Sequence, residues 1–254
     1  MNIVVPVKLV PDLVEELEIN QSGTALDMTL TRLIPNELDE HAIEQAVLLK
    51  ERGGGHVTVV VPDIEGADDV LYTACAKGAD RLIKITGDFE EEVNCHAMAR
   101  MFMPVVKELQ PDLVLTGVQA HDDLDGSVGP LLAAILGMPY VGYIAGVTAT
   151  NGNCVARKEY PGGLIAELEV QLPAVLGIQA PDEPPRYLAV SRVRQAMRTA
   201  TIEEFAAGSL DRSGGPTVTR MYRPDTGERA TMLEGDEEAV ATRMVEIFHE
   251  LGVL

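Results

Sequence analysis

The sequence has few basic residues. Its 254 residues include 20 Lys and Arg against 40 Asp and Glu, which gives a formal charge of -20 at pH 7. A charge of this sign repels nucleic acid and anionic membrane surfaces over long distances. We therefore expect no nucleic-acid partner.

Cysteine pairs and long apolar runs are also missing. Cys75, Cys95 and Cys154 are too far apart for the spacing of a zinc site or a redox pair, so we expect buried thiols in a reducing compartment. No stretch reaches the ~18 uninterrupted apolar residues of a membrane span, and the chain does not open with a basic region before an apolar run. These absences predict a cytoplasmic protein without direct membrane insertion.

The remaining composition is typical of a globular chain, with 46% apolar and 24% charged residues. Short runs rich in Val and Ile predict strands buried on both faces at 3–7, 57–61, 82–85 and 113–116. Helical spacing of apolar residues alternates with them, at 39–52, 68–77 and 93–109. The alternation predicts an α/β fold with a mostly parallel sheet covered by helices.

The pattern changes after about residue 139. Extended segments at 164–172 and 174–178 predict the end of the sheet, with an antiparallel hairpin. The proline-rich run at 181–185 predicts an extended linker, so we place a nucleotide-binding domain at 1–181 and a C-terminal arm at 182–254. Helical patterns in the arm cover 188–207 and 236–251. Because the arm has an apolar stripe but little core of its own, we expect it to dock on a partner subunit.

The loop from Gly117 to Pro130 is the candidate site, since it follows one predicted strand and precedes a helical pattern. Ligands of open α/β sheets lie at the carboxyl ends of strands, where helix N-termini offer N–H groups to anions. Glycines would let the backbone approach a phosphate, a serine would donate its hydroxyl, and aspartates would accept from ribose hydroxyls: Asp122, Asp123, Gly126, Ser127 and Gly129. No Lys or Arg belongs to the loop, so amides and the helix end alone would meet the phosphate charge.

Two other interpretations of the loop stay open. It is equally typical of a solvated turn with a helix cap, and Asp122, Asp123 and Asp125 would offer oxygen ligands to magnesium or calcium, although the EF-hand pattern is missing. Neither a Gly-x-Gly-x-x-Gly nor a P-loop motif follows any strand. No histidine accompanies a Ser or Cys nucleophile motif, so we predict no catalytic residue.

Five segments in register resemble the beta subunit of electron-transfer flavoprotein, over about residues 3 to 205. They are Val5-Pro-Val-Lys8-Leu-Val-Pro11-Asp12, Asn36-x-x-Asp39-x-x-Ala42-Ile43-Glu44-Gln45-Ala46, Gly78-Ala79-Asp80-Arg81, Gly117-x-Gln119-Ala120-x-Asp122, and Leu172-Pro173-Ala174-Val175 with Pro185-Arg186-Tyr187.

The resemblance implies a doubly wound α/β fold of the adenine-nucleotide alpha-hydrolase type, with helices on both faces of the sheet. It also implies a heterodimer in which the alpha subunit makes most contacts to a redox-active FAD. The beta subunit of classical members holds AMP, and that of electron-bifurcating members a second FAD. Residues that would line this nucleotide site by position are Pro6, Val7, Asn36 to Asp39, Pro62 and the loop from Gln119 to Gly129, including Val128. Leu13 falls where the family places a side chain against the flavin.

Two departures from the family pattern affect this prediction. The family expects Val-x-Arg-x-x-x-Gly-Gly-x-Glu, but here Lys158 precedes Gly162-Gly163 and the glutamate arrives late, at Glu167. The loop at 177–190, which would contact a flavin dehydrogenase, carries Asp182 where the family has an apolar anchor. A carboxylate enters a dry pocket only at a cost of several kcal/mol, so we do not expect a standard acyl-CoA dehydrogenase bound in the usual way.

The leading hypothesis is therefore an electron-transfer carrier subunit with AMP, rather than a bond-making catalyst. One alternative is an electron-bifurcating, NADH-using subunit with a second FAD in the beta site. Another is a stand-alone nucleotide-binding protein of the stress-protein type, in which the arm would fold back on its own core.

Overall fold

The computed structural model describes residues 1–29, 31–89, 93–124, 127–150, 152–224, 227 and 230–253. The chain forms two compact units, Met1–Arg220 and Met221–Leu254. The predicted boundary at residue 181 thus lies inside the first unit. The reason is that residues after 181 add a helix, α5 (Val190–Thr199), and a strand, β11 (Ile202–Ala206), to the first unit.

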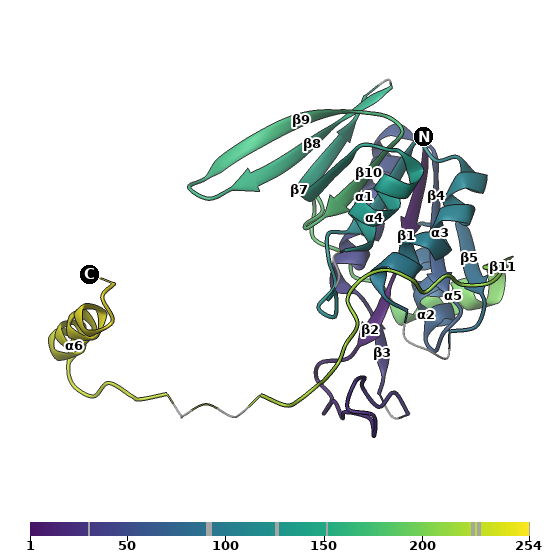
Figure 1. Ribbon diagram of the computed structural model, residues 1–254. Coiled ribbons are helices and arrows are strands. Elements are labelled where there is room, and N and C mark those ends of the chain that lie inside the picture. The colour runs from purple at the N-terminus through teal and green to yellow at the C-terminus, as the bar shows by residue number, and fades with distance from the viewer. Residues whose placement is uncertain are drawn as a thin grey trace. The chain divides into compact units, whose positions relative to one another are not determined.

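Within the described residues, the first unit is built on a nine-stranded sheet of order β11-β5-β4-β1-β6-β10-β7-β8-β9 (Figure 1). The parallel strands are β1 (Asn2–Pro6), β4 (His56–Pro62), β5 (Arg81–Thr86), β6 (Leu113–Gly117), β10 (Ala174–Ile178), β7 (Tyr140–Ala149) and β11. The antiparallel strands β8 (Asn153–Tyr160) and β9 (Leu164–Gln171) extend one edge. A separate two-stranded sheet pairs β2 (Leu9–Pro11) with β3 (Leu33–Pro35).

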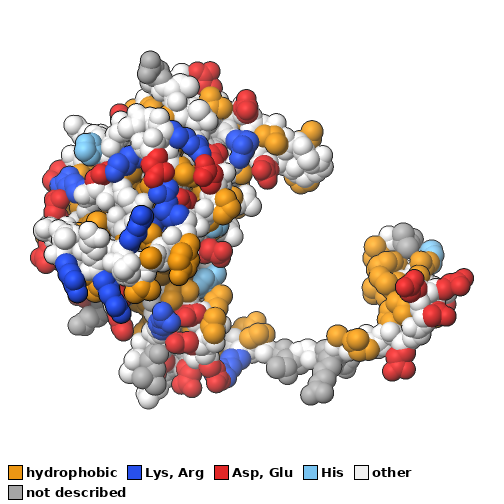
Figure 2. All heavy atoms as spheres, turned by 180° about the vertical axis from the view of Figure 1, so that it is seen from behind, with side chains coloured by type: hydrophobic (Ala, Val, Ile, Leu, Met, Phe, Trp, Pro, Cys, Tyr) orange, Lys and Arg blue, Asp and Glu red, His pale blue; other side chains and the backbone are white. Residues whose placement is uncertain are grey.

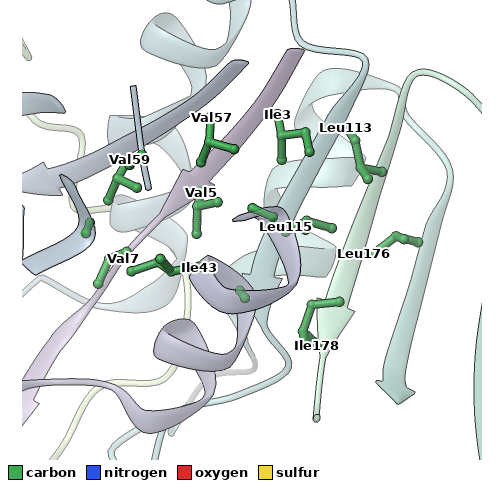
Figure 3. Packing of buried hydrophobic residues seen from close by; sticks show 14 of the residues in the cluster. Ile3, Val5, Val7, Ile43, Val57, Val59, Leu113, Leu115, Leu176 and Ile178 are labelled. Carbon is green, nitrogen blue, oxygen red and sulfur yellow. The ribbon is translucent and has the colours of Figure 1, made fainter. Parts of the chain in front are cut away.

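Alternate residues of the central strands enter two cores. Ile3, Val5 and Val7 of the first strand and its extension face α1 (Glu37–Gly53) and α2 (Ala67–Lys77), together with residues of β4, β6 and β10 (Figure 3). The residues between them, such as Val4, face α3 (Cys95–Leu109) and α4 (Val128–Leu136) on the other side. Full burial of each Val, Leu or Ile contributes about 1.5 to 3 kcal/mol. The predicted α/β fold, with helices on both faces of a mostly parallel sheet, is therefore confirmed.

Helix α1 forms where apolar residues and charge order agree. Its buried residues include Ala42, Ile43, Ala46 and Val47, which repeat at helical spacing. Acidic residues occupy its first turn and basic residues its last turn, as the helix dipole favours.

Two details of the predicted order differ in the structure. An antiparallel hairpin forms, but it joins β9 to β8, which was not predicted, and not to the segment at 174–178. That segment is β10, which does not end the sheet but lies parallel between β6 and β7. The helix expected over 188–207 ends at Thr199, and β11 then pairs with β5, placing Ile202 opposite Leu82 and Phe205 opposite Ile85. A neighbouring strand edge outweighs local helical spacing there.

The second unit contains α6 (Glu237–Glu250). Asp236 caps the helix, because its side chain accepts a hydrogen bond from the Ala239 N–H at 2.9 Å. None of the α6 residues is buried, and hydrophobic side chains gather along one side of the helix (Figure 2). In the described part of the chain, no helix is both long and apolar enough to cross a membrane.

Candidate functional site

A cleft opens where the winding of the sheet reverses. The chain proceeds from β1 to β4 and β5 on one side, and to β6 on the other, so the carboxyl ends of β1 and β6 form the switch point at which such sheets bind ligands. The cleft measures about 290 Å³, including space open to solvent. Its lining comes from both strand ends, α1, α3, α4 and the predicted loop: Pro6, Lys8, Asn36, Asp39, Phe102, Thr116, Gly117, Gln119, Ala120, Asp123, Ser127 and Val128.

Asp39 joins the two central strand ends. Its Oδ2 accepts from the Lys8 N–H at 2.9 Å and its Oδ1 accepts from the Gly117 N–H at 2.6 Å. Burial raises the pKa of Asp39 to about 6, and the hydrogen bonds from these two amides partly offset the rise. A Cβ at Gly117 would lie 2.7 Å from the Asp39 nitrogen, so only glycine lets the first turn of α1 approach β6 this closely.

Asn36 fixes the loop from the same helix end. Its Nδ2 donates to the Gln119 carbonyl at 3.0 Å, and its backbone N–H donates to the Lys8 carbonyl at 2.9 Å. The predicted residues Asn36 and Asp39 thus shape the cleft by joining α1, β1 and β6.

Lys8 was not predicted as a site residue. Its Nζ lies 2.6 Å from Asp122 Oδ1 and 2.9 Å from Asp123 Oδ1. Burial alone would lower the pKa of Lys8, but the two carboxylates outweigh it and raise that pKa above its usual value. The loop itself has no Lys or Arg, and Lys8, just beyond β1, brings a cation to the cleft lining. Because Lys8 is paired with two loop carboxylates, the expectation that amides and the helix end alone meet the phosphate charge stays a prediction. The available signal for Lys8 was its position two residues after Pro6 in the segment that resembles the family.

A buried hydroxyl of β6 has no hydrogen-bond partner, and the nearby start of α4 has no side-chain cap. The hydroxyl of Thr116 is buried and is among the described side-chain groups without a hydrogen-bond partner. Ser127 is the N-cap residue of α4 and makes no side-chain capping bond. A hydroxyl and the free N–H groups of a helix start can donate hydrogen bonds to a phosphate. The neighbouring apolar lining suits the adenine base. The residues present are therefore compatible with an adenine nucleotide.

Gly129 has a packing role in this region. A Cβ there would lie 2.6 Å from Thr116 Oγ1 and 3.1 Å from the ring of Tyr140. Burial raises the pKa of the Tyr140 hydroxyl to about 12, partly offset by a hydrogen bond with Ser127. The missing side chain at Gly129 lets α4 pack against β6 and β7.

The other predicted residues differ in position. Pro6, Gln119, Asp123, Ser127 and Val128 line the cleft with Asn36 and Asp39, whereas the structure gives Asp122 to a neighbouring cleft. Val7 is buried and its N–H donates to the Val60 carbonyl. Pro62 ends β4 beyond the cleft lining, and Leu13 is 60% exposed in the loop after β2.

Gly126 and Asp125 lie outside the described residues. Among the residues that are described, no group of three or more His, Cys, Asp or Glu has metal-binding geometry.

The 177–190 segment is attached to α1 by a cluster that we call the loop clamp: Glu44, Gln45, Glu51, Arg52, Asp182 and Arg186. Asp182 Oδ2 lies 2.7 Å from Arg52 Nη1 and accepts from Gln45 Nε2 at 3.0 Å. Arg186 Nε lies 2.8 Å from Glu44 Oε1, and its Nη1 lies 2.7 Å from Glu51 Oε1. The Asp182 side chain, 16% exposed, therefore faces its own subunit. Ile178, the last residue of β10, is the nearest large apolar side chain before Asp182, and it is fully buried, so it does not replace the missing anchor.

The fold and the cleft define a doubly wound α/β protein with a crevice at its switch point that polar and apolar residues line together. Residues 28–210 match the family model described as the electron transfer flavoprotein domain. The electron transfer flavoprotein beta subunit of Methylophilus methylotrophus is 33% identical over 98% of both chains. That of Syntrophomonas wolfei is 31% identical over 84% of this chain and 83% of its own, and Protein FixA of Azorhizobium caulinodans is 30% identical over 98% and 94%. The chain belongs to the electron transfer flavoprotein family, in which it is a subunit of the beta type.

Proposed function

We propose that this beta subunit forms a heterodimer with an electron transfer flavoprotein alpha subunit and holds AMP in the cleft between β1 and β6. The complex would work in the cytoplasm and pass electrons between flavin dehydrogenases and a downstream acceptor. The observation that carries the AMP proposal is the unpartnered Thr116 hydroxyl beside the uncapped start of α4, at a switch-point cleft.

In this proposal the chain contributes binding and orientation. FAD, shared with the alpha subunit, supplies the electron-transfer chemistry when it is bound. Thr116 and Ser127 hold the phosphate of AMP, while Asn36 and Asp39 keep the two strand ends in place. Leu13, which the structure leaves 60% exposed, would cover the flavin from the beta side. We assign no bond-making role to the described residues, so in this proposal the subunit is a carrier.

The C-terminal residues, including α6, would dock on the alpha subunit. In this chain, the apolar residues of α6 and of its C-cap are 37 to 69% exposed: Met244, Val245, Phe248 and Leu251. A helix with an apolar face and no buried residue needs a covering surface. The 177–190 segment would contact the dehydrogenase, and because Asp182 is held by Arg52, that contact would lack the usual apolar anchor.

Denaturation of the native complex, followed by mass spectrometry of the released nucleotides, tests the proposal. We expect one FAD and one AMP per heterodimer. A chain that purifies as a monomer without nucleotide would contradict both the heterodimer and the AMP site. A monomer that retains a nucleotide would favour the stand-alone nucleotide-binding protein.

A second candidate, the electron-bifurcating NADH-using subunit, is favoured by one observation. A larger cleft, of about 1,200 Å³ including space open to solvent, shares Lys8 with the first cleft, so a ligand longer than AMP has space to continue. In that case the same measurement would give two FAD and no AMP per heterodimer.

A further inference from the structure

Two clefts meet at Lys8. The first is the candidate nucleotide site, and the second, of about 1,200 Å³, lies between the loop before β3, the start of α3 and a segment beyond β11. Lys8 lines both, Asp123 lines the first and Asp122 lines the second. The three side chains, which we call the Lys8 bridge, therefore stand at the boundary between the clefts.

The Lys8 bridge is largely buried and held from several sides. The side chains of Lys8, Asp122 and Asp123 are 10%, 33% and 8% exposed. Asp123 Oδ2 accepts from the Ala120 N–H at 2.7 Å, and its Oδ1 accepts from Cys95 Sγ at 3.1 Å. Asp123 is thus held by both the loop and α3. Asp122 faces the second cleft and is held there by Lys8.

Breaking such a bridge is costly. Removing a partner from a buried ion pair leaves a charge without compensation, and the charge-assisted bonds at 2.6 and 2.9 Å are of the strong kind. A ligand confined to the first cleft leaves the bridge intact. A ligand that continues into the second cleft must displace Lys8 or Asp122.

We propose that the Lys8 bridge is a specificity determinant that confines the bound adenine nucleotide to the first cleft and disfavours nucleotides extended beyond the phosphate. This inference rests on the proposed nucleotide site and adds the element that selects the length of its ligand. Lys8 and Asp122 act as positioning residues, because their ion pair, and not a contact of either side chain with the nucleotide, sets where the site ends.

The test measures the affinities of the full-length chain, freed of nucleotide, for AMP and for FAD by isothermal titration calorimetry. A competition with AMP shows that FAD occupies the same site. We expect the wild type to prefer AMP. The double variant Lys8→Met/Asp122→Asn removes one pair of opposite charges. We expect its ratio of AMP affinity to FAD affinity to fall by about tenfold. Lys8→Arg keeps the charge and should keep the wild-type preference.

A matched control is Lys84→Met/Asp68→Asn, which removes an ion pair of 3.0 Å between β5 and α2; its preference should equal that of the wild type. The single variant Asp122→Asn, at a position one-third exposed, leaves Lys8 paired with Asp123 and should shift the preference by about threefold, even if the double variant does not fold. Unchanged preference in Asp122→Asn, or a wild type that binds FAD as tightly as AMP, overturns the inference alone. A wild type that binds neither nucleotide overturns the proposed nucleotide site as well.

Discussion

Two polar clusters attach distant segments to α1, one at each half of the helix. The cleft cluster consists of Lys8, Asn36, Asp39 and Gly117 at the N-terminal end, and its contacts join side chains to backbone groups that are buried. The loop clamp, farther along α1, consists mainly of ion pairs between side chains, among which Arg52 is 44% exposed. Buried bonds to backbone leave little room for change, whereas exposed ion pairs contribute little and are screened by salt. The cleft cluster should therefore determine the stability of the fold, and the loop clamp the position of one segment.

The largest expected effect comes from the cleft cluster. Gly117→Ala would place a Cβ within 2.7 Å of the backbone of Leu38 and Asp39, so the first turn of α1 must move; we expect a loss of about 3 kcal/mol in the free energy of unfolding, measured with urea. Gly53→Ala is the control, since a Cβ there meets nothing within 4 Å and the helix should gain about 0.5 to 1 kcal/mol. Equal effects of the two substitutions would contradict the tight approach at Gly117.

The pH dependence of stability should come next. The Asp39 carboxyl ionises at 3.8 in its ordinary state, and burial raises its folded pKa to about 6. Between these values the folded state binds more protons than the unfolded state, so stability falls as the pH rises from about 4 to about 6 and changes no further above that. Compared with Asp39→Asn, which cannot titrate, the wild type should lose about 2 to 3 kcal/mol over this window in urea unfolding. Parallel curves for the two proteins would show that Asp39 ionises normally.

Within the loop clamp, the most buried pair should matter most. Arg186→Met leaves Glu44, whose side chain is 2% exposed, with no charged partner among its described contacts, and should cost about 2 kcal/mol because Arg186 itself is partly exposed. Arg81→Met removes a pair with Glu203 in which both side chains are nearly half exposed, and should cost less than about 0.5 kcal/mol. Thermal and urea unfolding of both variants measures the difference, and a reversed order would show that burial does not set the strength of these pairs.

The smallest effect is expected for Arg52 and Asp182. A double-mutant cycle with Arg52→Ala and Asp182→Ala should give a coupling energy of about 0.5 to 1 kcal/mol, falling when NaCl is raised to about 0.5 M. A coupling energy that ignores salt would place this pair with the cleft cluster instead.

Local patterns in the sequence were sufficient for most of the parallel strands and their helices. Runs such as 57–61 predict a buried strand because every residue in them is apolar or β-branched, and β4 contains that run. The same reasoning located the loop after β6, because the relation between strand ends and ligands depends on topology alone.

Contacts between remote segments could not be predicted in this way. Lys8 meets Asp122 across 114 residues, and no local pattern marks either of them as a partner of the other. Thr116 looks like an ordinary strand residue until its hydroxyl is found buried without a partner. The same holds for two strand positions. Contacts across the whole sheet, and not local sequence, place β10 between β6 and β7 and pair β11 with β5.

The place of β10 also dictates an order of assembly. Strands β1, β4, β5 and β6 all come from residues before 118 and are neighbours in the sheet, but β7 reaches them only through β10, which is synthesised after the β8–β9 hairpin. During synthesis on a ribosome, the amino-terminal half can therefore form its sheet first. The edge of β6 stays unpaired, and β7 to β9 cannot join the sheet, until residues 174–178 emerge. Pulse-labelling hydrogen exchange during refolding should protect the amides of β1 and β4 before those of β7, and the reverse order would show that the hairpin side nucleates the protein.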